Sequence, residues 1–238
     1  MSVTPIYPYK IQKITQETHT TIIWEVVPEN GDIPHYEPGQ FAMIHLYNPD
    51  GTVQQKKAYS MSSSPKGKKF LEFGIKIHGD FTQKMATLQK NDLIGVQSPF
   101  GNFIYKPKIH NNLVIFAGGI GITPFVSMMR FATYDAPENR ILMFYCNQTE
   151  QDIAYKKTLD DLCQKNSNIK IVYSVDRSLA ERTMYETGFL SAERVIKYVT
   201  DFTGKYFFLC GPIPFMKSVR EILRIKNVPD ERIKQEVF

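Results

Sequence analysis

The feature that most constrains the fold is an apolar run that ends in a cluster of glycines, residues 114–124, with the sequence VIFAGGIGITP. An apolar segment followed by glycines, a threonine and a proline predicts a β-strand, a tight turn, and the N-cap and first position of a helix. Backbone N–H groups at such a turn point outward and the helix dipole favours an anion, so a phosphate group fits there. Gly118, Gly119 and Gly121 matter because a Cβ would block positive φ angles and the close approach of a diphosphate. The spacing is not G-x-G-x-x-G, so by itself it fits a dinucleotide site and a plain strand-to-helix turn about equally well.

Composition places the chain among globular proteins. Of its 238 residues, 42% are hydrophobic and 22% are charged, which is typical of a folded domain, and the length allows one large domain or two ordinary ones. No apolar stretch approaches the roughly 20 residues that a membrane helix needs. The first residues lack a basic segment followed by an apolar one, so we expect no signal peptide and no membrane insertion. A cytoplasmic location is therefore expected.

The cysteines exclude several kinds of site. There are three, Cys146, Cys163 and Cys210, and they are widely spaced with no C-x-x-C pair. Such spacing supports neither a disulfide framework nor an iron–sulfur or zinc site, so we expect no metal. Any redox chemistry would need an organic cofactor.

The net charge of +5 is modest and gathers in short basic clusters, at Lys56 and Lys57, at residues 66–69, and at Lys106 with Lys108. These clusters fit a solvated surface, and they also fit a docking face for an acidic protein or a phosphorylated ligand. They are short and not interleaved with aromatic residues, so nucleic acid is not an expected partner.

The two halves of the chain follow different patterns. Residues 20–27, 40–46 and 70–77 are rich in β-branched and aromatic residues and are separated by turn residues, which predicts an antiparallel barrel or sandwich. One helix is expected within it, at residues 81–88.

From residue 113 onward, apolar strands alternate with amphipathic helices. Strands are expected at residues 113–116, 141–145, 170–173, 206–210 and 233–237. Helices are expected at residues 124–133, 155–165, 191–199 and 214–226. This alternation predicts a doubly wound parallel sheet whose ligands bind at the carboxyl ends of its strands.

Short motifs occur in a fixed order along nearly the whole chain: KAYS at 57–60, GDFT at 79–82, AGGIGITP at 117–124, CGP at 210–212 and EVF at 236–238. In this order they resemble the ferredoxin–NADP reductase superfamily. The segments YCNQTEQDI at 145–153 and VDR at 175–177 are most similar to its NADH–cytochrome reductase branch. The resemblance implies an FAD-binding β-barrel domain at residues 1–107 and an α/β domain at residues 108–238 that binds NADH or NADPH.

The resemblance also implies which residues bind the flavin. Tyr59 is expected to pack on the flavin ring, and Ser60 to hydrogen-bond flavin N5. Lys57 stands where members usually have an arginine for the diphosphate; lysine keeps the charge but loses the bidentate fork. Gly79 and Thr82 are expected at the diphosphate as well, although capping of the following helix is the ordinary alternative. The remaining expected flavin contacts are Ala58, Ile75, Lys76 and Ile77, the last three through their backbone.

The nucleotide contacts are implied in the same way. Those expected around the diphosphate are Gly118, Gly119, Gly121, Ile122, Thr123 and Pro124. Cys210, Gly211 and Pro212 are expected at the nicotinamide, with Cys210 as a positioning residue and not a nucleophile. Asp176 stands where NADPH-using relatives tend to have a serine, so it favours NADH by repelling a 2′-phosphate. Arg177 acts in the opposite direction.

The C-terminal residues complete the expected site. Glu236 corresponds to a carboxylate that plant-type members keep near the flavin for proton control, and Phe238 to a terminal aromatic that covers the flavin face. A frayed tail is the ordinary alternative for both. The residues expected at the reacting atoms are thus Ser60, Cys210, Glu236 and Phe238.

The implied activity is that of an FAD-dependent NAD(P)H oxidoreductase, which takes a hydride from NADH onto flavin N5. The electrons then pass to a protein or small-molecule acceptor such as a ferredoxin, a Rieske protein or a cytochrome. Two alternatives remain open at this point. The chain fits an electron-relay subunit of a larger complex, and it also fits a non-catalytic nucleotide-binding scaffold with the same fold.

Overall fold

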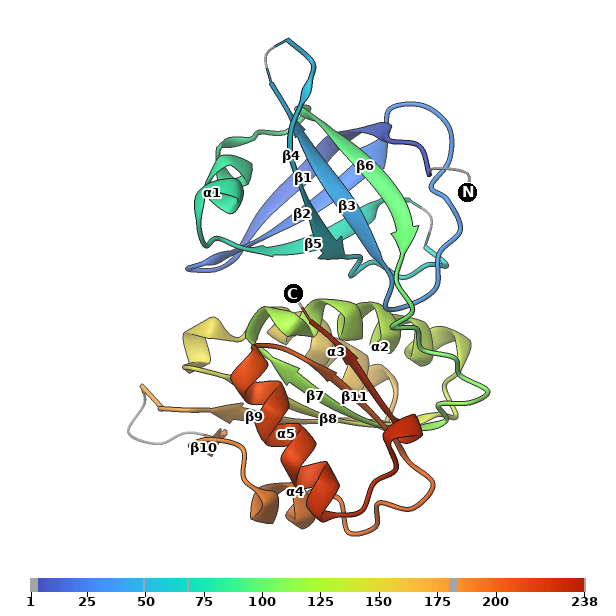
Figure 1. Ribbon diagram of the computed structural model, residues 1–238, viewed down its shortest axis with the longest axis vertical. Coiled ribbons are helices and arrows are strands. Elements are labelled where there is room, and N and C mark those ends of the chain that lie inside the picture. Colours follow the sequence, from blue (N-terminus) through green and yellow to red (C-terminus); the bar gives the residue numbers. More distant parts are fainter. Residues whose placement is uncertain (1–3, 49, 68, 180–183, 238) are drawn as a thin grey trace. The chain divides into compact units, whose positions relative to one another are not determined.

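The computed structural model describes residues 4–48, 50–67, 69–179 and 184–237. Its contacts divide the chain into two compact units (Figure 1). One unit comprises the residues up to Tyr105 together with Thr123–Phe131, and the other comprises Lys106–Ile122 and the residues from Ala132 onward. The domain boundary expected between residues 107 and 108 stays a prediction.

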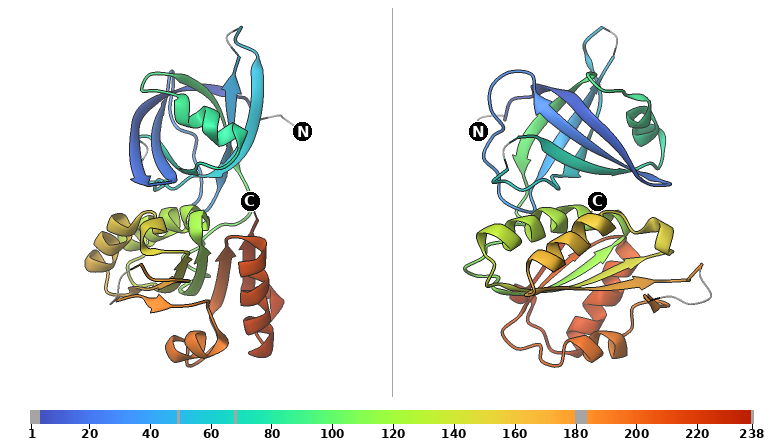
Figure 2. Two further views of the ribbon diagram at one scale, coloured as in Figure 1. Left: turned by 90° about the vertical axis from the view of Figure 1, so that its left-hand side faces the viewer. Right: turned by 180° about the vertical axis from the view of Figure 1, so that it is seen from behind.

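The first unit contains an antiparallel sheet. Its elements are β1 (Tyr7–Thr18), β2 (Thr21–Pro28), β3 (Phe41–Tyr47), β4 (Val53–Ser60), β5 (Leu71–Lys76), α1 (Asp80–Thr87) and β6 (Leu93–Phe100). Within the described residues, six strands pair in the order β4-β3-β6-β1-β2-β5. The two outer strands, β4 and β5, also contact each other. The sheet therefore closes into the expected β-barrel (Figure 2).

The interior of the barrel is filled by large apolar side chains. In β2, the buried Ile22, Trp24 and Val26 alternate with the less buried Ile23, Glu25 and Val27, as the period of two in a strand requires. Phe73 on β5 lies opposite Trp24, and both are fully buried. Each such side chain contributes roughly 1.5–3 kcal/mol to folding when it is removed from water.

The second unit contains a parallel sheet. Its elements are β7 (Asn112–Gly118), η1 (Gly119–Ile122), the end of α2 (Thr123–Asp135), β8 (Arg140–Asn147), η2 (Glu150–Asp152), α3 (Lys156–Lys165), β9 (Ile169–Val175), β10 (Glu186–Thr187), α4 (Ala192–Tyr198), β11 (Tyr206–Cys210), α5 (Ile213–Ile225), η3 (Asp230–Arg232) and β12 (Ile233–Glu236). Six described strands pair in the order β10-β9-β8-β7-β11-β12. The expected α/β fold with a parallel sheet is confirmed.

Helices cover the two faces of the parallel sheet. On one face, apolar side chains of β7, β8 and β11 pack against α4 and α5, with Phe116 and Phe144 stacked at 5.1 Å between ring centroids. α3 lies on the opposite face (Figure 2). The carboxyl ends of β7 and β11 lie side by side in this sheet, with Ala117 opposite Cys210. This edge therefore brings the glycine cluster next to the CGP motif.

Most elements of the second unit agree with the sequence to within two residues, whereas three strands of the barrel were missed. β1, β4 and β6 escaped because their outward-facing residues are polar or interrupted, as in the mostly exposed β4 sequence VQQKKAYS. The start of α2 also differs from the expectation. The helix begins at Thr123 itself, after a 3₁₀ turn, and its N-cap residue Ile122 makes no side-chain capping bond. Pro124 lies in the first turn, as predicted.

Among the helices in the described part of the chain, none is long and apolar enough to cross a membrane.

Candidate functional site

The last residues of β4 meet the start of α1. The Tyr59 ring is stacked on that of Phe81, with centroids 6.3 Å apart and planes 19° apart. The ammonium group of Lys57 lies 5.5 Å from the centroid of the same Phe81 ring. Burial raises the pKa of Tyr59, so its phenol stays neutral at physiological pH. Lys57 and Tyr59 thus stand on one side of β4, two residues apart, with Phe81 between their tips.

Ser60, the last residue of β4, is the most unusual polar group of this region. Its side chain is 3% exposed. Within the described residues its hydroxyl oxygen has no hydrogen-bond partner. A buried hydroxyl without a partner costs about 1–3 kcal/mol. The strand therefore ends in a hydroxyl group that is not satisfied by the described protein atoms.

A glycine turn precedes α1. Gly79 has a φ angle of 79° and is the N-cap residue of α1, and a Cβ at this position would meet no atom within 4 Å. The Thr82 hydroxyl accepts the His78 N–H at 2.6 Å and donates to the Gly79 carbonyl oxygen at 3.1 Å. These bonds fix the turn locally, so capping is one role of Thr82. The open side of Gly79 leaves room for a group at the helix N-terminus.

The glycines after β7 have two different surroundings. Gly119 has a φ angle of 54°, and a Cβ there would meet nothing within 4 Å. A Cβ on Gly121 would instead lie 2.5 Å from the Cys210 carbonyl oxygen, and one on Gly118 would lie 2.9 Å from the Phe215 ring. The sequence analysis assigned all three glycines to the approach of a diphosphate. In the structure, Gly118 and Gly121 permit close packing within the chain, and Gly119 faces open space.

Cys210 ends β11 beside these glycines. It pairs in register with Ala117 of β7 on one side and with Glu236 of β12 on the other. Burial and the charge of Glu236 raise the pKa of the Cys210 thiol well above its ordinary value. Burial also raises the pKa of the Glu236 carboxyl. A thiol that remains protonated is a poor nucleophile, which agrees with a positioning role.

The residues after β9 are tied to those after β8. The Asp176 N–H donates to the Asn147 carbonyl oxygen at 2.9 Å, and the Arg177 N–H donates to the Gln148 carbonyl oxygen at 3.1 Å. Both side chains are exposed. Desolvation raises the pKa of Asp176, and burial together with the Asp176 charge raises the pKa of Cys146 to about 12. The backbone is thus fixed where the carboxylate of Asp176 and the guanidinium of Arg177 project outward.

Comparison with known proteins identifies a domain in each part of the chain. Residues 8–105 match the oxidoreductase FAD-binding domain family. Residues 115–221 match the oxidoreductase NAD-binding domain family. The chain thus combines an oxidoreductase FAD-binding domain with an oxidoreductase NAD-binding domain, as the resemblance implied. FAD and a nicotinamide nucleotide are the cofactors that these two domains bind.

Individual relatives are distant. A flavohemoprotein of Rhodopirellula baltica is 27% identical over 97% of this chain, which spans 60% of that protein. The NADH-cytochrome b5 reductase 2 of Candida glabrata is 27% identical over 88% of this chain and 72% of its own length. The cytochrome b5 reductase domain of Ulva prolifera nitrate reductase superimposes with a TM-score of 0.86 at 21% identity, over 99% of this chain and 98% of that domain. The last likeness concerns the fold alone.

The residues of this chain fit both cofactors on structural grounds. The unsatisfied Ser60 hydroxyl and the open turn at Gly79 fit a flavin nucleotide in the barrel unit. The open face of Gly119, before the first turn of α2, fits a diphosphate in the α/β unit. Most of the expected positions thus gather in two groups, one in each unit, whereas Thr123 and Pro124 belong by their contacts to the barrel-containing unit. Phe238 lies outside the described residues, so its expected role stays a prediction.

The sequence analysis missed two residues of these groups. Phe81 fills the space between Lys57 and Tyr59, and was seen only as the start of a helix. Asn147 is 5% exposed and neither polar atom of its side-chain amide has a partner in the described part of the chain. Its signal in the sequence is a polar residue that ends an apolar strand at the carboxyl edge of a parallel sheet.

Proposed function

We propose that this reductase oxidises NADH and passes the electrons to a protein or small-molecule acceptor such as a ferredoxin, a Rieske protein or a cytochrome. FAD, when bound, supplies the chemistry, because a flavin takes up a hydride and releases electrons singly. The chain itself supplies binding, orientation and electrostatics.

The observation that carries the proposal is the buried, unsatisfied hydroxyl of Ser60. It ends the strand whose preceding residues are Lys57, Ala58 and Tyr59. A cofactor that offers a hydrogen-bonding atom here would remove the cost of the unpaired hydroxyl. We assign Ser60 to flavin N5, Tyr59 to the flavin ring and Lys57 to the diphosphate. Gly79 and Thr82, with the backbone of residues 75–77, complete the proposed flavin contacts.

For the nucleotide, the diphosphate is assigned to the open turn at Gly119 and the first turn of α2, residues 118–124, where N–H groups and the helix dipole attract an anion. The residues 210–212 are assigned to the nicotinamide. Because the backbone of Asp176 is fixed by its bond to Asn147, its exposed carboxylate can accept hydrogen bonds from ribose hydroxyls and repel a 2′-phosphate. This favours NADH, and Arg177 weakens the preference.

Glu236 and Cys210 are assigned to the control of protons and of the nicotinamide position. Burial raises the pKa of the Glu236 carboxyl, so it takes up a proton more readily than an exposed glutamate. The thiol of Cys210, paired in register beside it, remains neutral. The two side chains therefore present one exchangeable proton and one apolar surface at the carboxyl end of β11.

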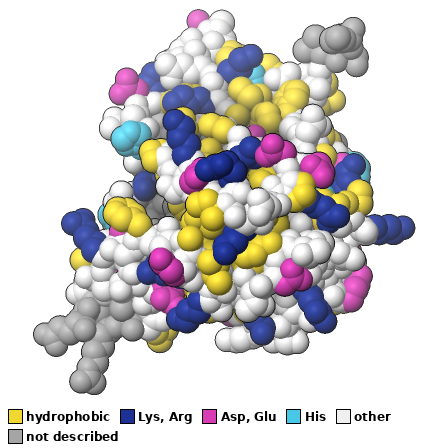
Figure 3. Space-filling view, turned by 60° about the horizontal axis from the view of Figure 1, so that its bottom comes forward, with side chains coloured by type: hydrophobic (Ala, Val, Ile, Leu, Met, Phe, Trp, Pro, Cys, Tyr) yellow, Lys and Arg dark blue, Asp and Glu magenta, His cyan; other side chains and the backbone are white. Residues whose placement is uncertain are grey.

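The charged surface of the chain bears on the choice of electron acceptor. On the face drawn in Figure 3, Lys and Arg side chains are interspersed with Asp, Glu and hydrophobic side chains and form no continuous basic area. Lys56, Lys57, Lys106 and Lys108 are nevertheless exposed. Long-range attraction by such clusters would favour an acidic acceptor protein and would weaken with salt. The cytoplasmic location and the absence of nucleic-acid partners stay predictions.

The proposed function is tested with the purified protein. A yellow protein whose flavin colour bleaches on adding NADH, and which then reduces ferredoxin, Rieske protein or cytochrome, would support it. Acid release followed by chromatography should give FAD; recovery of FMN alone would contradict the cofactor assignment. A colourless protein that binds no flavin would favour the scaffold alternative. Reduction of acceptors only in the presence of further subunits would favour the relay alternative.

A further inference from the structure

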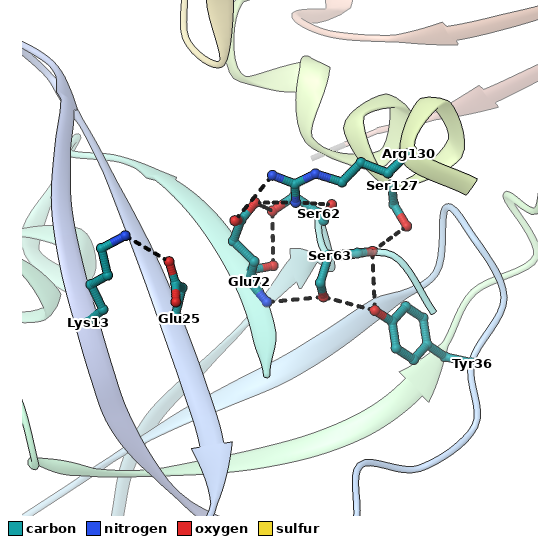
Figure 4. A network of polar contacts seen from close by, with 8 residues as sticks. All are labelled: Lys13, Glu25, Tyr36, Ser62, Ser63, Glu72, Ser127 and Arg130. Atoms are coloured by element: carbon teal, nitrogen blue, oxygen red, sulfur yellow. Dashed lines mark hydrogen bonds and ion pairs between the residues drawn. The ribbon is translucent and has the colours of Figure 1, made fainter. Parts of the chain in front are cut away.

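A buried polar network fixes the first part of α2 within the barrel-containing unit (Figure 4). The Arg130 guanidinium donates to both carboxylate oxygens of Glu72, at 2.7 and 3.3 Å, and to the Ser62 carbonyl oxygen at 2.9 Å. Ser62 in turn donates from its hydroxyl to the same carboxylate at 2.8 Å. Only 8% of the Glu72 side chain and 20% of the Arg130 side chain are exposed.

A second branch of the network runs through the next residue. The Ser127 hydroxyl donates to the Ser63 carbonyl oxygen at 2.7 Å, and the Tyr36 hydroxyl donates to the same oxygen at 3.1 Å. The Ser63 hydroxyl accepts the Glu72 N–H at 3.1 Å. Ser63 and Ser127 are both buried. Two successive residues of one segment are therefore bonded to two successive turns of α2.

The partners in this network occupy informative places in the chain. Ser62 and Ser63 follow Tyr59 and Ser60 with one residue between them, so they continue the segment proposed to hold the flavin ring. Ser127 and Arg130 stand on the helix that begins directly after the glycine turn proposed to hold the nucleotide diphosphate. The network thus links the two binding segments through one strand end and one helix.

Stability alone does not account for a buried ion pair at this place. Replacing such a pair by apolar residues of similar volume is often neutral or stabilising, because two charges lose their hydration on burial. Unlike apolar residues, the ion pair imposes a single defined geometry, because the guanidinium group is planar and its hydrogen bonds are directional.

We propose that Glu72 and Arg130 are positioning residues that couple nucleotide binding at the N-terminus of α2 to the flavin-binding segment at residues 59–63. This inference rests on the proposed function and extends it to a pair that touches neither cofactor. When the pair is intact, the first part of α2 and the segment at residues 62–63 move as one body within the barrel-containing unit, so a change at the start of α2 reaches the flavin-binding segment. A misplacement of about 1 Å at reacting atoms costs up to 10²-fold in rate.

The test variant is the double substitution Glu72→Leu with Arg130→Met, which removes both charges together and leaves no unpaired buried ion. Arg130→Lys serves as the conservative variant, because it retains the charge and one bond. The matched control is Lys13→Met with Glu25→Leu. It removes a surface ion pair of the same unit, in which Lys13 of β1 and Glu25 of β2 lie 3.1 Å apart. Each variant is examined as the flavin-loaded protein, with its melting temperature recorded.

The first readout is independent of activity. Amide hydrogen exchange is followed with and without ADP-ribose, which carries the diphosphate of the nucleotide. In the parent and the control, ADP-ribose should slow exchange around the glycine turn and also at residues 59–73. In the apolar double variant, protection should remain at the turn and be lost at residues 59–73. Arg130→Lys should restore part of it.

The second readout separates rate from binding. Stopped-flow reduction of the flavin by NADH should be at least 10-fold slower in the apolar double variant, while the Kd for ADP-ribose by calorimetry changes less than twofold. Parent-like exchange at residues 59–73 and a parent-like reduction rate in a folded, flavin-loaded double variant would overturn the inference. So would a loss of rate matched by an equal loss of ADP-ribose affinity. If NADH fails to reduce the parent protein, it is the proposed function that fails, and the exchange experiment still decides the coupling.

Discussion

The two proposed binding sites, one for the flavin and one for the nucleotide, are built from different parts of the polypeptide. In the barrel unit the proposed contacts are side chains: the cation of Lys57, the rings of Tyr59 and Phe81, and the hydroxyl of Ser60. In the α/β unit the central element is the bare backbone around Gly119 and Gly121. The proposed flavin site therefore depends on which chemical groups are present, whereas the proposed nucleotide site depends on how closely two chain segments approach each other.

This difference predicts different tolerance to substitution. A side-chain contact can be replaced by a group of similar chemistry, as the resemblance implies for Lys57, which stands where arginine is usual. At Gly121, by contrast, an added Cβ would lie 2.5 Å from the backbone of another chain segment. We therefore expect no other residue to be tolerated there, because neither main chain can move without disturbing the sheet. The predictions below test this contrast, beginning with the largest expected effect.

The largest effect is expected for Gly121→Ala. Its Cβ would lie 2.5 Å from the Cys210 carbonyl oxygen and 2.7 Å from the Gly211 nitrogen. Because both are backbone atoms, we expect a loss of about 3 kcal/mol in the free energy of unfolding, the upper end of the usual range for overpacking. The matched change Gly119→Ala meets open space and incurs only the left-handed φ, about 1 kcal/mol. Urea denaturation of both variants measures the difference; equal losses would remove the distinction between the two glycines.

Lys57→Met should come next. Removing the ammonium group takes away a charge-assisted contact to the flavin diphosphate, worth about 1.5–3 kcal/mol, so flavin affinity should fall roughly tenfold or more. Lys57→Arg should retain or strengthen the affinity, because the guanidinium binds phosphate through two bonds. Flavin content after dialysis and the circular dichroism of the apoprotein are the measurements. Unchanged flavin content in Lys57→Met would show that Lys57 is not the diphosphate ligand.

His110 is an exception to this contrast between side chains and backbone, because it lies in the α/β unit and its side chain makes specific contacts. Its ring lies 4.8 Å from those of Tyr206 and Phe208, and Nδ1 accepts the Lys106 N–H at 2.8 Å. Burial, with the charges of Lys234 and Lys106, lowers its pKa from 6.5 to about 4. Between pH 6.5 and about pH 4, His110 binds a proton in the unfolded chain but not in the folded chain. The free energy of unfolding therefore falls as the pH falls through this range.

From pH 7 to pH 5 this linkage should remove roughly 1–2 kcal/mol from the free energy of unfolding. In His110→Gln that part of the pH dependence should vanish, whatever the absolute stability of the variant. His35→Gln, at an exposed position, is the control and should keep the parent slope. Chemical denaturation at several pH values gives the slopes, and a parent-like slope in His110→Gln would refute the assignment.

The smallest effect is expected for Asp176→Ser. The parent should use NADH with a higher kcat/KM than NADPH, because the carboxylate repels a 2′-phosphate. Removing this exposed charge should raise kcat/KM for NADPH by about fivefold, equivalent to about 1 kcal/mol. Arg177→Gln should lower NADPH use further, since its cation attracts the phosphate. A parent that prefers NADPH would contradict the role given to Asp176.

Much of the fold could be predicted from the sequence, because the patterns that indicate its strands and turns are local. The apolar strands from residue 113 onward and the glycine cluster after β7 each have a signature within about ten residues. β4 was missed as a strand because its exposed residues lack the usual alternation, although its last four residues were recognised as a motif. Local patterns therefore singled out the short motif at residues 57–60 but not the strand that contains it.

Non-local features could not be predicted. Nothing in the sequence shows that Gly121 lies against Cys210, 89 positions later, or that Arg130 is bonded to Glu72. The unsatisfied amide of Asn147 is likewise visible only once its neighbours are placed. These relationships arise from chain segments that meet in the folded state, so an isolated stretch of sequence holds no record of them.

The grouping of residues 123–131 with the barrel unit has a consequence for recombination between relatives. A chimera joined at residue 107 would take its barrel from one parent and its α2 from the other. Glu72 would then be buried opposite whatever side chain the second parent carries in place of Arg130. Exchange of the nucleotide-binding half between distant reductases should therefore succeed only where residues 123–131 travel with the barrel. The module to be exchanged is therefore a discontinuous piece of the chain, the barrel together with residues 123–131.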